Sequence, residues 1–178
     1  EASSLTSPEE ARAWGEESLI IRLPSSSGAT RPIESYPDQK MPADSIETVI
    51  TRRGSTRKFS HDPITFAGLS TVLEKASSEI PSDFLQPQSP SLNQMCLIVN
   101  AVDGLQPGAY AFHSDSQTLE LLRHGDFRDE AGQLGLDQQL AADSSVNVYF
   151  MADLDSILTA YGNRGYRVAQ LEASIAAG

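Results

Sequence analysis

The chain has 178 residues and a formal net charge of −11 at pH 7, from 13 Lys and Arg against 24 Asp and Glu. That length fits one domain, or one domain plus an arm, and the acidic balance argues against bulk electrostatic binding of nucleic acid or of an anionic membrane. The single cysteine, Cys96, excludes an internal disulfide and a cysteine-rich metal site. Because the apolar runs are short and no signal-peptide pattern opens the sequence, we expect a soluble, cytoplasmic protein.

The sequence divides by composition into an arm and a domain. Residues 1–43 contain stretches rich in Pro, Ser and Gly, such as "LPSSSGAT", and are expected to form an N-terminal arm or an inter-domain linker. Residues 44–178 carry periodic apolar patterns, so we expect the folded domain there.

Two amphipathic helices are predicted at the start of this domain. The first begins after Asp44 or Ser45, both suitable N-caps, and its apolar residues follow helical spacing at Ile46, Val49 and Ile50. It should end at Arg53-Gly54, because Gly commonly terminates helices. The second lies in "ITFAGLSTVLEKAS", with Thr65 as its cap and an apolar face formed by Phe66, Leu69, Val72, Leu73 and Ala76.

The remainder predicts mixed secondary structure. A Ser- and Pro-rich surface loop over 77–93 precedes a meander of three strands over 95–122. Residues 126–142 are expected to form two helical pieces broken near Gly135, followed by a strand in "VNVYFMA" and by helices on both sides of "YGNRG". Since strands and helices do not alternate regularly, the pattern favours an α+β fold.

The segment "RRGSTRKFS", residues 52–60, concentrates positive charge in an acidic chain. Four of the 13 basic residues stand within seven positions, at Arg52, Arg53, Arg57 and Lys58, with hydroxyl groups such as that of Ser55 between them. Guanidinium and hydroxyl donors suit the oxygens of a phosphate group. A solvated surface cluster, or one paired with acidic side chains, remains the alternative, and the glycine pattern is not that of a P-loop.

Four segments in chain order resemble the nitroreductase superfamily, and within it the SagB-type or azoline-oxidase branch. They are "ITRRGSTRKFSHDPITFAGLSTVLEKA", "PSLNQMCLIVNAVDGLQPGAYAF", "TLELLRHGDFRDE" and "YGNRGYRVAQLEAS", which together cover roughly residues 44 to 178. The resemblance implies a nitroreductase-like fold with a mixed or antiparallel central sheet flanked by helices, in a dimeric or pseudo-dimeric arrangement.

The resemblance also implies a cofactor and an activity. The expected protein is an FMN-dependent oxidoreductase that transfers a hydride or two electrons between flavin and a small-molecule or peptide substrate, with NAD(P)H as a possible electron donor. The implied cofactor-binding residues are Arg53, Ser55 and Arg57 at the phosphate and ribityl chain, Arg52 beside them, and Pro90, Ser91 and Asn93 at the ring. Tyr161 is the candidate catalytic proton donor or acceptor, with a core or interface tyrosine as the alternative.

Three departures from the family pattern motivate a second hypothesis. Leu92 and Asn93 stand where the family has Ala-Gly, Ala160 stands where azoline oxidases have Lys, and Ser174 stands where the long helix has Gly. These differences would suit a degenerate, non-catalytic domain with a structural or dimerisation role. An anion-binding module unrelated to flavin is a third possibility.

The expected partners follow from the same resemblance. The first residue is Glu and the last residues interrupt a helical pattern, so we expect a fragment or one half of a tandem protein. A second subunit, or a second nitroreductase-like domain or chain, would complete the flavin site. Neither nucleic acid nor a membrane is expected as a partner, and the three scattered histidines predict no metal site.

Overall fold

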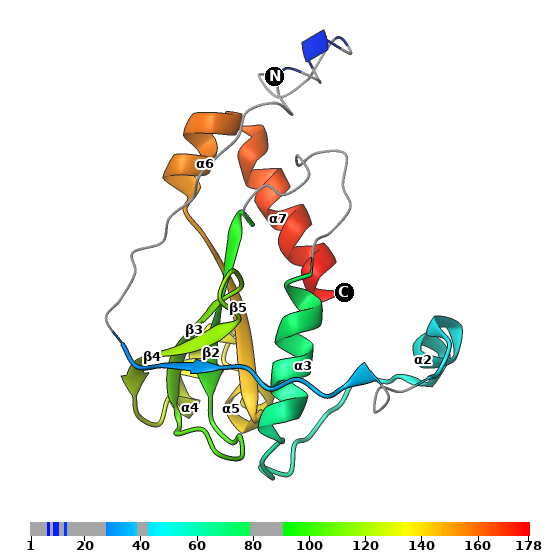
Figure 1. Ribbon diagram of the computed structural model, residues 1–178, viewed down its shortest axis with the longest axis vertical. Helices are drawn as coiled ribbons and strands as arrows, with labels where there is room; N and C mark the ends of the chain where they lie inside the picture. The colour runs from blue at the N-terminus through cyan, green and yellow to red at the C-terminus, as the bar shows by residue number, and fades with distance from the viewer. Residues whose placement is uncertain (1–6, 8, 11–12, 14–27, 39–42, 79–90) are drawn as a thin grey trace. The chain divides into compact units, whose positions relative to one another are not determined.

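The computed structural model describes residues 7, 9–10, 13, 28–38, 43–78 and 91–178 (Figure 1). The chain divides into two compact units. Among the described residues, the sheet unit holds 28–38, 43–75 and 97–148, and the helical unit holds 76–78, 91–96 and 149–178 with the few described residues before position 28. Within these residues, no helix combines the length and the apolar character needed to cross a membrane.

A five-stranded sheet has the strand order β1-β4-β3-β2-β5. The strands are β1 (Thr30–Pro32), β2 (Asn93–Val99), β3 (Gly108–His113), β4 (Thr118–His124) and β5 (Val146–Ala152). β4 pairs antiparallel with both β1 and β3. Because β2, β3 and β4 are consecutive in the chain and adjacent in the sheet, the predicted three-stranded meander is confirmed, as is the α+β class.

The core of the sheet unit is formed by apolar side chains that alternate along the strands. Phe112 of β3 and Leu119 of β4 face each other in register and are 2% and 1% exposed. Leu97 and Val99 at the end of β2 are also buried. Such cross-strand apolar pairs are a main source of sheet stability, so the meander supplies a rigid support for the loops at its edges.

The first predicted helix forms as α2 (Ile46–Arg52) and ends at the predicted position, but glycine does not end it. Ser45 is the N-cap, and its side chain accepts a hydrogen bond from the N–H of Thr48 at 3.3 Å. The helix ends at Arg53 in an extended conformation (φ −68°, ψ 138°). Gly54 does not adopt a left-handed φ, so the prediction that a glycine cap ends the helix was wrong.

The second predicted helix forms as α3 (Phe66–Ala76), and Thr65 caps it by accepting from the N–H of Gly68 at 3.1 Å. Phe66, Leu69 and Leu73 are buried, as the apolar spacing predicted. The burial of these side chains fixes α3 in the sheet unit. The helix begins a few residues after the basic segment ends.

The segment that follows β1 lies along α3. The main-chain N–H of Glu34 donates to Ser70 Oγ at 3.0 Å, and that of Tyr36 donates to Thr71 Oγ1 at 2.8 Å. Ser70 and Thr71 are therefore buried, whereas Val72, predicted on the buried face, is 60% exposed. This part of the predicted arm thus belongs with the sheet unit. It covers the side of α3 that carries Ser70 and Thr71, so the buried face of the helix does not include Val72.

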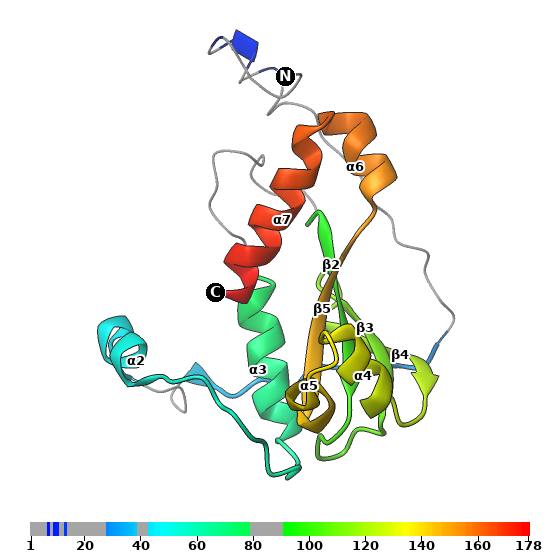
Figure 2. The same cartoon turned by 180° about the vertical axis from the view of Figure 1, so that it is seen from behind.

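Two short helices follow β4, as predicted. α4 (Arg128–Leu134) and α5 (Gln139–Asp143) are separated by a break that begins at Gly135. Figure 2 shows the two helices side by side, and the guanidinium of Arg128 donates to the main-chain oxygen of Ala142 at 2.6 Å.

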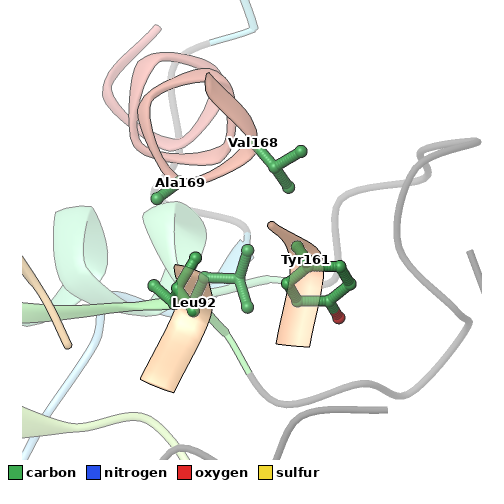
Figure 3. Packing of buried hydrophobic residues seen from close by; sticks show 5 residues of the cluster. Leu92, Tyr161, Val168 and Ala169 are labelled. Atoms are coloured by element: carbon green, nitrogen blue, oxygen red, sulfur yellow. The ribbon is translucent and has the colours of Figure 1, made fainter. Parts of the chain in front are cut away.

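The helical unit contains the two predicted C-terminal helices, α6 (Leu154–Tyr161) and α7 (Arg164–Ala177). The predicted break between them occurs at Gly162, which has a φ of 59° that favours glycine. The two helices share an apolar cluster with the residue that precedes β2 (Figure 3); its members are Leu92, Ile157, Tyr161, Val168 and Ala169.

Candidate functional site

The basic segment begins at Arg52, the last residue of α2, in the sheet unit, and residues 53–63 have no helix or strand assigned. Arg53, Ser55 and Arg57 all lie on it with exposed side chains. Among the described residues, these three side chains form no hydrogen bond or ion pair. Their guanidinium and hydroxyl donors are therefore available to a ligand, and planar guanidinium groups can bind a phosphate through two parallel hydrogen bonds.

Arg52 differs from its neighbours because it is already paired. Its Nη2 atom lies 3.0 Å from Asp44 Oδ2, across the length of α2. It also stands in the last turn of that helix, where a cation interacts favourably with the unpaired carbonyl groups. Arg52 thus stabilises its own helix and is less available to a ligand than Arg53 or Arg57.

The residues that follow the basic segment are fixed to α5, to Ser145 between α5 and β5, and to the turn after β2. His61 Nε2 lies 2.8 Å from Asp143 Oδ1, and the Ser145 hydroxyl donates to the main-chain oxygen of Asp62 at 3.0 Å. Ile64 forms a parallel bridge with Val102. The exposed residues between α2 and His61 are therefore held at both ends while their side chains face solvent.

Hydrogen bonds from Gln139 and His61 hold the pKa of Asp143 below its usual value of 3.8. The carboxylate is consequently ionised over the physiological range, and an ionised carboxylate acts only as an acceptor. This charge state keeps the anchor at His61 intact near neutral pH.

A shallow hollow on the surface of α2 does not suit an anion. It is lined by Glu47, Thr48, Thr51 and Arg52. Hydrogen bonds from its own main chain and from Ser45 lower the pKa of Glu47, so its carboxylate is ionised and repels a phosphate. The phosphate candidates are therefore the three side chains beyond the helix, not this hollow.

The residues predicted at the flavin ring lie in the helical unit, except for Pro90, which is outside the described residues. Ser91 is exposed, and its hydroxyl closes a local turn by accepting from the N–H of Asn93 at 3.2 Å and donating to the oxygen of Asn93 at 2.8 Å. Ser91 is thus presented at the surface in a defined conformation at the start of β2.

Asn93, the third residue predicted at the ring, is engaged with α7. Its side-chain amide donates both hydrogens, one to the main-chain oxygen of Ala169 and one to Glu172 Oε2, each at 2.8 Å. These two bonds use its donor capacity. Asn93 therefore fastens the start of β2 to the helix, and its amide hydrogens are not free for a flavin.

Tyr161 ends α6 and is 5% exposed within the apolar cluster. Figure 3 shows its ring beside Leu92, with the phenolic oxygen on the side away from Val168 and Ala169. This placement matches the core tyrosine considered as the alternative. A catalytic role for Tyr161 stays a prediction.

Glu172 is a buried charged residue of this region that was not predicted from the sequence as a site residue. It lies on α7 and is only 6% exposed, and both of its carboxylate oxygens accept from the main-chain N–H of Leu92, at 2.9 and 3.1 Å. The available signal was its position: Glu172 is three and four residues beyond the apolar Ala169 and Val168, which places it on the buried face of the helix.

The described residues contain no group of three or more His, Cys, Asp and Glu side chains arranged to hold a metal ion. The lone thiol, Cys96, lies on β2, and partial burial raises its pKa. A thiol with a raised pKa is mostly protonated and a poor nucleophile.

Comparisons with known proteins bear on the fold. No protein-family model matches the chain, and no curated protein matches it. Among solved structures, a protein from Anabaena variabilis ATCC 29413 that is assigned as a nitroreductase aligns with 84% of this chain, at a TM-score of 0.70 and 25% sequence identity. The fold is nitroreductase-like.

A second structure supports the same fold. A protein from Ralstonia eutropha JMP134, also assigned as a nitroreductase, aligns with 90% of this chain and 75% of its own, at a TM-score of 0.60 and 18% identity. The alignment with the Anabaena protein covers 32% of that protein, so this chain spans about a third of its length. The nitroreductase-like fold expected from the four sequence segments is confirmed.

Proposed function

We propose that this chain binds FMN and acts as an oxidoreductase that transfers a hydride or two electrons between the flavin and a small-molecule or peptide substrate. The nitroreductase-like fold supports this reading in general. The observation that carries it is the pair of exposed guanidinium groups, Arg53 and Arg57, which have the hydroxyl of Ser55 between them in sequence and no partner among the described residues.

The donor set of the basic segment fits the phosphate of FMN. A phosphate dianion is stabilised by charge-assisted hydrogen bonds, and two guanidinium groups with a nearby hydroxyl supply them. Arg52 would add positive potential without direct contact, because Asp44 already holds it. The segment is fixed at both ends, which lowers the conformational entropy that ligand binding must remove.

At the ring, Ser91 and Pro90 are the proposed contacts; because the Ser91 hydroxyl donates its hydrogen to the main-chain oxygen of Asn93, it would contact the flavin as an acceptor. Bound FMN would supply two-electron chemistry, with NAD(P)H as a proposed electron donor, and the chain's own residues would bind and orient it. A second subunit or a second domain of the same kind is proposed to complete the site. A cytoplasmic location and the SagB-type branch belong to the same proposal.

Two observations favour a second candidate function, a degenerate domain with a structural or dimerisation role. Both amide hydrogens of Asn93 are used by α7, and Tyr161 is buried among apolar side chains. Two residues predicted to serve the flavin thus contribute to packing. Under this alternative the basic segment would be a solvated surface cluster.

Titration of the purified chain with FMN, followed by quenching of flavin fluorescence, distinguishes the two candidates. We expect saturable binding, and a loss of affinity on the order of tenfold for each guanidinium removed in an Arg53→Ala/Arg57→Ala variant. Arg52→Ala is the matched control, because it removes the same group from a paired side chain, and it should change affinity by less than about threefold. A wild-type chain that takes up no FMN contradicts the proposal and favours the structural alternative.

A further inference from the structure

Glu172 is a buried carboxylate that holds one short segment of the chain. Its side chain is on α7, and its partners are the main-chain N–H of Leu92 and the side-chain amide of Asn93. Acceptance of hydrogen bonds by both oxygens is the geometry of an ionised carboxylate. Burying a charge is unfavourable unless it is compensated by such bonds. Glu172 can therefore lie on the buried face of α7 because Leu92 and Asn93 donate hydrogen bonds to it.

Helix α7 also contacts Asn93 at a second residue. The main-chain oxygen of Ala169, one turn before Glu172, accepts the other amide hydrogen of Asn93 at 2.8 Å. Between these polar contacts, the Leu92 side chain inserts into the apolar cluster and is 2% exposed. Polar and apolar contacts therefore fix Leu92 and Asn93 on α7, and Ser91 is left exposed directly before them.

The hydrogen bonds of Glu172 are not needed for a stable packed core. A buried ionic group can often be replaced by apolar residues of similar volume without loss of stability. A carboxylate that accepts a main-chain N–H instead selects one backbone conformation, because only that conformation aims the N–H of Leu92 at it. The conformation so selected determines where Ser91 is presented.

We propose that Glu172 is a positioning residue of the flavin site, which acts through Leu92 and Asn93 to set the position of Ser91 against the ring. The inference rests on the proposed function, since it assigns the ring to Ser91. It predicts that a substitution of Glu172 weakens binding of the flavin ring and leaves binding of the phosphate unchanged.

The test compares Glu172→Gln with wild type for binding of FMN and of riboflavin, which lacks the phosphate. Gln keeps the side-chain length and one acceptor, but its NH2 group faces the donors of Leu92 and Asn93. We expect both flavins to bind on the order of tenfold more weakly, with the ratio of the two dissociation constants unchanged. At saturating FMN, the visible absorption band of the bound flavin should also shift, which a loss of stability alone would not produce.

Glu130→Gln is the matched control, because it makes the same chemical change at an exposed position on α4. It should leave both dissociation constants and the absorption band as in wild type. Hydrogen exchange at the Leu92 amide, expected to be faster in Glu172→Gln only, confirms that the contact has been broken.

If Glu172→Gln does not fold, Glu172→Asp provides the measurement, since it keeps the charge and shortens the reach by one methylene group. The inference is overturned if a folded variant with faster exchange at Leu92 binds both flavins as wild type does and leaves the band unshifted. A wild-type chain that binds neither flavin instead overturns the proposed function, so the two failures are distinguishable.

Discussion

Gly165 lies where the start of α7 packs against α6. A Cβ atom at this position would lie 2.6 Å from Ile157 Cγ2 and 2.8 Å from the main-chain oxygen of Ile157. Because the oxygen belongs to a helix backbone, it cannot move away cheaply. The absence of a side chain at Gly165 therefore lets the two helices approach.

We predict that Gly165→Ala lowers the free energy of unfolding by about 1–3 kcal/mol, the usual range for overpacking, as measured by urea denaturation. Gly54→Ala is the control, because a Cβ there would meet nothing within 4 Å and its φ is not positive. It should change stability by no more than about 0.5 kcal/mol. Equal effects of the two substitutions would contradict the close packing at Gly165.

At the same scale, the exposure of the phosphate candidates could be predicted from the sequence, whereas the hydrogen bonds of the ring candidates could not. Arg53 and Arg57 could be singled out because exposed charge on a loop depends little on distant packing. The role of Asn93 could not be, because it depends on Ala169 and Glu172, residues more than 70 positions away that only tertiary structure brings near. Glu172 was missed for the same reason.

At the scale of elements, the docking of the segment after β1 on α3 can be tested through its hydrogen bonds. In Ser70→Ala/Thr71→Val, the N–H groups of Glu34 and Tyr36 lose their acceptors. We expect faster amide exchange at both positions, corresponding to about 1–3 kcal/mol of lost local protection. The measurement is residue-resolved hydrogen exchange.

The control for this pair is Val72→Ala on the same helix, which changes a side chain that is 60% exposed. Exchange at Glu34 and Tyr36 should not respond to it. Unchanged exchange in the double variant would mean that the segment is held by β1 alone.

The order and type of the elements could be predicted from apolar periodicity, which indicated the meander, the pair α4 and α5, and the pair α6 and α7. The N-cap of α2, Ser45, was predicted from its residue type. The misses have local causes. Val72 has the spacing of a buried residue, but the face of α3 that is covered includes Ser70 and Thr71, which contact the preceding segment. Gly54 was expected to end α2, but Arg53 ends it in an extended conformation. A helix can end in this way without a residue in the left-handed conformation.

For the whole molecule, we predict loss of stability in acid through two carboxylates. The pKa of Asp143 is lowered by hydrogen bonds from Gln139 and His61, and that of Asp153 by hydrogen bonds from Ser156, both from a usual value of 3.8. A pKa that is lower in the folded state contributes stability above the unfolded value, and this contribution is lost as pH falls through the folded value. The contribution of these two carboxylates to stability should therefore be constant between about pH 7 and 5 and fall below about pH 4.

Thermal unfolding across this pH range checks the prediction. Asp153→Asn, which removes the charge that caps α6, should lower the unfolding midpoint at neutral pH and weaken its fall in acid. Asp155→Asn, a change in the first turn of the same helix at an exposed residue, is the comparison. A midpoint that falls equally steeply in Asp153→Asn and wild type would rule out this contribution.

For the whole chain, we propose that its exposed basic segment binds the phosphate of FMN. Comparison of the dissociation constants for FMN and riboflavin tests it most directly, in wild type, Arg52→Ala and Arg53→Ala/Arg57→Ala. We predict that wild type prefers FMN by on the order of 100-fold, that Arg52→Ala keeps most of this preference, and that the double variant binds the two flavins about equally. A wild-type chain that binds both flavins equally, or a double variant that keeps the full preference, would contradict it.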